Sequence, residues 1–294
     1  MLLTWTTMIR WILLIPLLIE NSLGFENEVE PVGSTGPAAT VRVFEGATSP
    51  RNLFLGDSLS DTGNLSDIIG GLGEAYPGAS LTNGLTWPAY LDPGLARITG
   101  VLPVPPETAP ASITTSLDLS VGAATSEAIL GIQAGTTLDF FLPAFQPTRR
   151  DRAFIWGGGN DFIDLFDSEI LRGEGEIEAA IDNAVSSIAE SARTVREKGF
   201  QKVTVISLLN LGLAPRASGL EVIGEEVSES FNSRLLDQLR SQPSPGDTLW
   251  VDSFALFNDI ARNPSAYGFS NVTDPAAPMA DEDIPSPLPP RNSG

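Results

Sequence analysis

Residues 52–64 read NLFLGDSLSDTGN, an apolar stretch that runs directly into a glycine and a set of small polar residues. The apolar part, Asn52 to Leu55, has the length and composition of a buried strand. In open parallel sheets, ligands bind beyond the carboxyl ends of the strands. The hydroxyl of Ser58 is therefore a candidate nucleophile in a cleft, although a turn with helix capping would explain this stretch taken alone.

Two later apolar runs end in the same way. Leu117 to Val121 is followed by Gly122 and small residues, and Ala153 to Trp156 is followed by three glycines and Asn160. Glycines let the backbone approach a ligand, and backbone N–H groups or an amide side chain can stabilise a developing oxyanion. Tight packing at Gly122 and a capped turn at Asn160 are the structural alternatives.

The remaining periodicity predicts alternating helices and strands. Apolar residues recur at three- and four-residue steps over 175–198 and over 222–240, the pattern of amphipathic helices. Further strands are expected at 202–207 and 248–251, and shorter helices at 84–92 and 253–261. This alternation predicts an α/β fold with a mostly parallel five-stranded sheet covered on both faces, its last element incomplete.

Composition divides the chain into four parts. Residues 1–24 combine Arg10 with a nine-residue apolar run and small residues, as secretory signal peptides do, with an uncleaved interfacial anchor as the alternative. Residues 25–50 are expected to form a linker, 51–275 the folded domain, and 276–294 a disordered, proline-rich acidic tail. The protein is therefore predicted to be secreted.

The charge balance limits the partners. With 17 Lys and Arg against 37 Asp and Glu, the net charge of −20 disfavours nucleic acid and anionic membranes. The sequence has no cysteine, which excludes disulfides, and the lack of both cysteine and histidine argues against a zinc site. After the signal segment no stretch is expected to cross a membrane. A monomer that acts on a small molecule, a lipid or a glycan is expected.

Taken together, the polar segments resemble a known family. Residues 56–64 are similar to the first block of the GDSL-type (SGNH) hydrolases, in the branch of plant GDSL lipases and bacterial lecithinase-haemolysin-like enzymes. Residues 158–161 match the third block, G-x-N-D. Shorter similarities occur at 210–215, 231–235 and 263–269, so the resemblance runs from about residue 50 to about residue 275.

The resemblance implies a flavodoxin-like three-layer fold and an ester hydrolase. Ser58 would be the nucleophile, and its own N–H, the N–H of Gly122 and the Asn160 side chain would form the oxyanion hole. Acyl transfer to water would need no metal or cofactor. Where the family has paired glycines this chain has Gly122 and Ala123, so either could be the backbone donor; Ala123 can serve with a negative φ, and a positive φ there would cost energy.

The catalytic base is missing from the pattern. The family's D-x-x-H block should follow residues 267–273, but 276–294 contain six prolines and an acidic run, and the sequence has no histidine. Truncation or a frameshift near residue 275 is the favoured explanation. The alternatives are a glycan- or lipid-binding protein without turnover, and an esterase whose base is Asp252, Asp274 or Asp281. As written, the chain is expected to be inactive or very weak.

Overall fold

The computed structural model describes residues 50–72, 80–82, 84–97, 112–166, 173–242 and 248–274. The predicted signal peptide, the linker apart from Pro50, and the tail with Asp281 lie outside the described residues. The described part forms a parallel sheet with the strand order β2-β3-β1-β4-β5-β6. The strands are β1 (Asn52–Gly56), β2 (Ala96–Arg97), β3 (Leu117–Asp118), β4 (Arg152–Trp156), β5 (Lys202–Ile206) and β6 (Thr248–Val251).

The five predicted strands are confirmed, and the two-residue edge strand β2 is an addition to them. Strand β3 is shorter than predicted, but Leu119 and Val121 still donate backbone hydrogen bonds to Phe54 and Gly56 of β1. Without β2, the order of the strands is that of flavodoxin-like sheets. Strands β2 and β3 lie on one side of β1, and β4, β5 and β6 lie on the other, so the strand order reverses between β1 and β4. These two strands are paired in parallel along the whole of β1. This switch point is where such sheets bind ligands.

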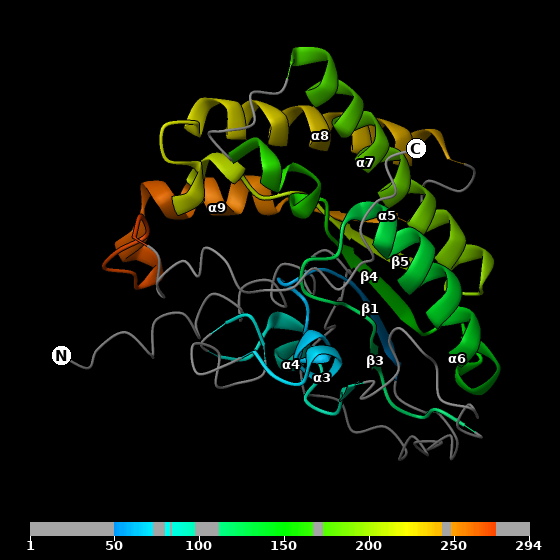
Figure 1. The fold of residues 1–294 in the computed structure, drawn as a ribbon. Coiled ribbons are helices and arrows are strands. Elements are labelled where there is room, and N and C mark those ends of the chain that lie inside the picture. Colours follow the sequence, from blue (N-terminus) through cyan, green and yellow to red (C-terminus); the bar gives the residue numbers. More distant parts are fainter. Residues whose placement is uncertain are drawn as a thin grey trace, which may run out of the picture.

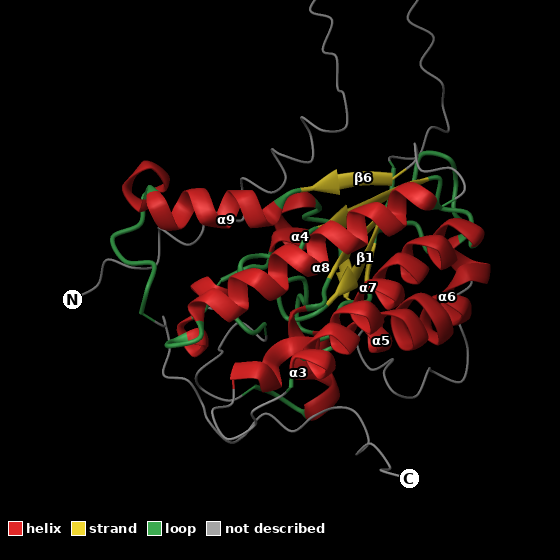
Figure 2. Cartoon of the chain, turned by 90° about the horizontal axis from the view of Figure 1, so that it is seen from above, coloured by secondary structure: helices red, strands yellow, loops and turns green. Residues whose placement is uncertain are grey.

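Helices cover both faces of the sheet (Figures 1 and 2). One face carries a continuous run of α5 (Ser126–Ala128), the π-helical η1 (Ile129–Thr137) and α6 (Leu138–Phe145), beside α7 (Glu174–Glu197) and α8 (Glu221–Ser241). The other carries α4 (Trp87–Leu91) and α9 (Ser253–Arg262). The remaining helical segments are α3 (Asn64–Ile69), η2 (Gly159–Phe166), η3 (Leu211–Leu213), η4 (Pro215–Ala217) and η6 (Pro264–Tyr267).

Successive side chains along each strand point to opposite faces of the sheet, and this alternation divides the core into two clusters. Leu53 and Leu55 of β1 point into the large cluster under α5 to α8, whereas Phe54 points into a smaller cluster with Trp87 and Trp156. The predicted amphipathic helices α7 and α8 are confirmed and line the large cluster. Their apolar stripes therefore explain why this face of the sheet is covered.

The helical run from Ser126 to Phe145 was not predicted from the sequence. By length and composition it could cross a membrane, contrary to the expectation that no such stretch follows the signal segment. It packs on the sheet, and Ile129, Leu138 and Phe145 are almost completely buried there. Its apolar composition is thus accounted for by burial in the core.

A buried ion pair closes the amino-terminal end of β1. Arg51 contacts Asp151 with an Nη2–Oδ2 distance of 2.6 Å, donates to the carbonyls of Ile113 and Phe145, and stacks over the Phe145 ring at 3.9 Å. Burial by itself would raise the pKa of Asp151, but the hydrogen bonds and charge of Arg51 hold it below its usual range. Removal of one partner alone would leave the other buried and unpaired.

We predict that Arg51→Met lowers the free energy of unfolding by about 3–5 kcal/mol, as expected for one partner of a buried ion pair. Chemical denaturation measures the change. Arg149→Met, at an exposed arginine close in sequence, is the control and should have little effect. Equal losses for the two variants would contradict the structural role of Arg51.

Candidate active site

Ser58 lies in a tight turn directly after β1. The carbonyl of Asp57 accepts backbone hydrogen bonds from Ser60 at 3.0 Å and Asp61 at 2.9 Å, and the Asp57 carboxylate accepts one from Leu59 at 3.0 Å. These bonds close the turn and leave Ser58 half-buried at its first corner. The hydroxyl is therefore presented at the carboxyl end of the sheet, as the sequence predicted.

Gln133 fixes the end of the strand that leads to Ser58. From η1 its side chain accepts from the Gly56 N–H at 2.8 Å and donates to the Gly56 carbonyl at 2.7 Å. Gln133 is almost fully buried, so both of its bonds form away from water. This residue was missed in the sequence, where nothing marked an isolated glutamine as a partner of β1.

The carboxylate of Asp61 joins the loops after β1 and β3. It accepts four backbone N–H bonds, from Gly63 at 2.7 Å, Asn64 at 2.6 Å, Leu65 at 3.0 Å and Gly122 at 2.8 Å. Three of the donors belong to the start of α3, and the fourth lies in the loop after β3. One buried side chain thus sets the distance between the first and second blocks of the site.

Asp118 forms a second link between the same two loops. It accepts from the N–H and the hydroxyl of Thr62 at 2.9 and 2.7 Å, and from the N–H of Ser120 at 2.9 Å. The Asn64 side chain donates to the carbonyls of Asp118 and Ser120 at 3.0 and 2.8 Å. These bonds hold the two loops in a single arrangement.

Asn160 connects the third block to the second. Its amide donates to the carbonyl of Ala124 at 3.0 Å, and the neighbouring Asp161 accepts from the N–H and hydroxyl of Ser126 at 2.9 and 2.7 Å. The amide of Asn160 has two hydrogens, so a second donor remains. Gly158 before it is needed, because its φ is +111° and a Cβ there would lie 2.8 Å from the Phe231 ring.

The second block differs from the expectation in two respects. The N–H of Gly122, expected in the oxyanion hole, donates to Asp61 and so is already engaged. A Cβ at this position would lie 2.6 Å from Leu65 and 2.7 Å from Leu81, which explains the glycine. Ala123 has φ +62° instead of the negative value that suits alanine. No acceptor for its N–H is found among the described residues.

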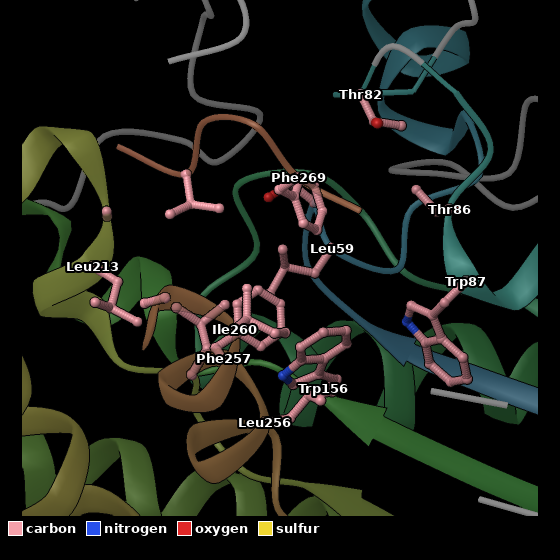
Figure 3. A pocket seen from close by; sticks show the side chains of 15 residues that line it. Leu59, Thr82, Thr86, Trp87, Trp156, Leu213, Leu256, Phe257, Ile260 and Phe269 are labelled. Carbon is pink, nitrogen blue, oxygen red and sulfur yellow. The ribbon is translucent and has the colours of Figure 1, made fainter. Parts of the chain in front are cut away.

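An apolar pocket of about 380 Å³ opens beside Ser58 (Figure 3). Residues from α4, α9, the end of β4 and the loops after β1, β5 and η6 contribute to it. They are Ser58, Leu59, Thr82, Thr86, Trp87, Trp156, Leu209, Leu213, Ala214, Leu256, Phe257, Ile260, Ala261, Phe269 and Val272. Its size falls within the range of small-molecule sites.

The candidate substitute bases lie elsewhere. Asp252 caps α9 through the Ala255 N–H at 2.9 Å, and Asp274 accepts from the Asn271 side chain at 2.7 Å. Both carboxylates are exposed, and neither is among the described residues that line the pocket. Asp281 lies outside the described residues.

Three buried carboxyl groups of the site have raised pKa values, and two of them are shifted strongly. Burial raises the pKa of Asp57 to about 7. The hydrogen bond from the Leu59 N–H lowers this pKa, whereas the nearby charges of Asp161 and Asp61 raise it further. Burial likewise raises the pKa of Asp118 to about 7, although the hydrogen bonds from Thr62 and Ser120 lower it. Burial also raises the pKa of Asp61, although four N–H donors oppose it.

We predict that Ala123→Gly raises the free energy of unfolding by about 0.5–1 kcal/mol. The left-handed conformation costs alanine about 1–2 kcal/mol, of which the greater freedom of glycine in the unfolded chain offsets a part. Ala179→Gly, at an exposed position inside α7, should instead cost about 1 kcal/mol. Urea denaturation compares the two, and destabilisation by both would refute a strained Ala123.

We also predict that the melting temperature falls as the pH rises from about 4 to about 7. In this range the folded protein holds a proton on Asp57 that the unfolded chain releases. Rising pH therefore lowers the free energy of the unfolded state relative to that of the folded state. In Asp57→Asn the fall should be shallower. Asp67→Asn removes the same charge from an exposed position and is the control. Identical slopes for the two variants would show that general charge repulsion causes the fall.

The comparisons with known proteins cover the part of the chain that contains the blocks described above. Residues 53–278 match the family model described as GDSL-like Lipase/Acylhydrolase. The anther-specific proline-rich protein APG of Arabidopsis thaliana is 25% identical over 285 residues, covering 79% of this chain and 52% of that protein. A GDSL esterase/lipase of the same plant is 24% identical over 127 residues, covering 40% of this chain and 34% of the relative. The chain thus spans about half or less of the length of these relatives.

Solved structures with a similar course of the chain are more distant. An acetyl-xylooligosaccharide esterase, Axe2 from Geobacillus, is 14% identical with a TM-score of 0.44, over 74% of this chain and 84% of that one. A gut microbial diltiazem-metabolizing enzyme is 13% identical with a TM-score of 0.41, over 75% of this chain and 41% of that one. The family model covers well over half of the sequence, and the chain therefore belongs to the GDSL-like lipase/acylhydrolase family.

Proposed function

We propose that this protein is a secreted carboxylic-ester hydrolase in which Ser58 is the acyl acceptor. The observation that carries the proposal is the position of Ser58, at the switch point of the sheet and on the lining of the apolar pocket. A serine there can attack the carbonyl of an ester whose apolar part occupies the pocket, so that the acyl group moves to the serine oxygen and the alcohol, taking up the hydroxyl proton, is released. Hydrolysis of the acyl-enzyme by water would complete the reaction.

The oxyanion hole is proposed to consist of the Ser58 N–H, the Ala123 N–H and the Asn160 amide. Ala123 takes the place first given to Gly122, because Asp61 already accepts from the Gly122 N–H. No acceptor for the N–H of Ala123 is found among the described residues, so this donor is available to a ligand. Preorganised donors of this kind contribute about 2.7–4 kcal/mol each to the stabilisation of the transition state.

The printed sequence offers no histidine to take the proton of Ser58, and no carboxylate lies among the described residues of the pocket. A serine without a base retains only the rate that the hole and the pocket supply, roughly 10³–10⁴ over water in proteases. We therefore propose slow turnover by this chain alone. The alternative is a lipid-binding protein that retains the pocket, which the apolar lining favours over a glycan-binding one.

We predict that imidazole in the buffer restores ester hydrolysis by supplying the missing base. The rate with p-nitrophenyl butyrate should rise and saturate with imidazole for the wild type. For Ser58→Ala only the linear solution reaction of imidazole should remain. Mass spectrometry of quenched samples should show the butyryl group on the peptide that contains Ser58. Asn160→Ala should lower the restored rate by roughly 10²–10³.

The same experiment separates the two functions. If the wild type and Ser58→Ala respond equally to imidazole and no acylated peptide forms, Ser58 is not a nucleophile and the binding protein is the better description. Circular dichroism of each variant verifies that the fold is unchanged.

A further inference from the structure

The pocket beside Ser58 has few groups that could hydrogen-bond a ligand. Apart from Ser58, the described residues that bring a side-chain oxygen to the lining are Thr82 and Thr86. The two indole N–H groups are engaged, since Trp87 donates to the Ser60 hydroxyl and Trp156 to the Ser207 carbonyl, each at 3.0 Å. A sugar placed here would lose bonds to water without replacement, which costs binding free energy.

No charged side chain occurs among the described residues that line the pocket. The chain as a whole carries a net charge of −20. A carboxylate or phosphate ligand would therefore meet repulsion outside and find no counter-charge inside. The pocket suits a neutral, apolar group.

The side chains on α9 define how far such a group can extend. Leu256, Phe257 and Ile260 lie together across from Trp156, and Leu213 lies beside them (Figure 3). Ala261 also lines the pocket and is the smallest side chain that α9 contributes to it. A water occupies about 30 Å³ in the liquid, and a methylene group is of similar size, so about 380 Å³ holds roughly a dozen methylene groups.

We propose that this pocket binds the acyl chain of a neutral ester of about ten carbons, with the carbonyl at Ser58 and the chain end against α9. The inference rests on the proposed function for the position of the carbonyl. The binding of the chain itself needs no turnover. Leu213 and Ala261 are proposed to set the length of chain that fits.

Binding of primary alcohols tests this without relying on catalysis. Trp87 and Trp156 line the pocket, so their fluorescence reports its occupation. From 1-butanol to 1-decanol the dissociation constant should fall roughly fourfold for each added methylene, because burial of one methylene contributes about 0.8 kcal/mol. For alcohols longer than the pocket, the dissociation constant should level off. Xylobiose at the same concentrations should not change the emission.

Two substitutions should move the length at which affinity levels off, in opposite directions. Ala261→Leu fills the pocket and should shift the limit to shorter alcohols by about three carbons, since it adds three side-chain carbons. Leu213→Ala enlarges the pocket and should shift the limit to longer ones. Ala255→Leu, at an exposed position of the same helix, is the matched control and should not move it.

The rise in affinity from 1-butanol to 1-decanol is measured on the wild type and does not depend on turnover. If imidazole restores no activity but affinity still rises with chain length, the proposal that Ser58 is the nucleophile fails, whereas the proposal of an acyl-chain pocket stands. Equal affinity for 1-butanol and 1-decanol, or a limit that neither Ala261→Leu nor Leu213→Ala moves, would overturn the proposal.

Discussion

Four backbone N–H groups converge on the carboxylate of Asp61, and the rest of the site depends on this arrangement. The donors come from the start of α3 and from the loop after β3, segments that no strand pairing joins. Without the carboxylate, these buried groups would lose their partner, at about 1–3 kcal/mol for each unsatisfied group. Asp61 engages the N–H of Gly122, whereas no described residue accepts from the N–H of Ala123. The side chain that holds the loops together therefore also determines which of the two N–H groups is available to the proposed oxyanion hole.

The pocket arises from the way the smaller core cluster is built. Trp87, Trp156, Leu256 and Phe257 hold α4 and α9 against the sheet, and the same side chains line the space beside Ser58. The pocket is thus the place where this cluster opens toward solvent. Its apolar lining follows from the packing of the core, so the preference for an apolar ligand and the attachment of α9 have one physical origin. Substitutions that alter one of them will alter the other unless they are confined to small residues at the rim of the pocket.

The sequence was sufficient for the strands and for the two long amphipathic helices, because apolar runs and a 3.6-residue period are local signals. It was not sufficient for residues 126–145, where Gly131, Gly135 and Pro143 interrupt the helical pattern and the wide π turns shift its period. Ser58 and Asn160 could be selected because each follows a strand. The engagement of Gly122 could not be foreseen, since its partner lies 61 residues earlier and is defined only by the packed loops. For the same reason, the positive φ of Ala123 has no sequence signal.

Asp57 shows why a suitable pKa does not make a catalytic base. Burial raises its pKa to about 7, the range that a general base at neutral pH requires. However, Oδ1 accepts from the Leu59 N–H, Oδ2 lies 3.9 Å from the point where a Cβ of Gly157 would be, and no hydrogen bond joins this carboxyl group to the Ser58 hydroxyl. A base must first reach the proton it removes, and only then does its pKa matter. In the proposed reaction, the described residues would therefore polarise a carbonyl and hold its acyl chain, whereas no carboxylate is among the described residues that line the pocket beside Ser58. This division is why an external base is the decisive reagent for this protein.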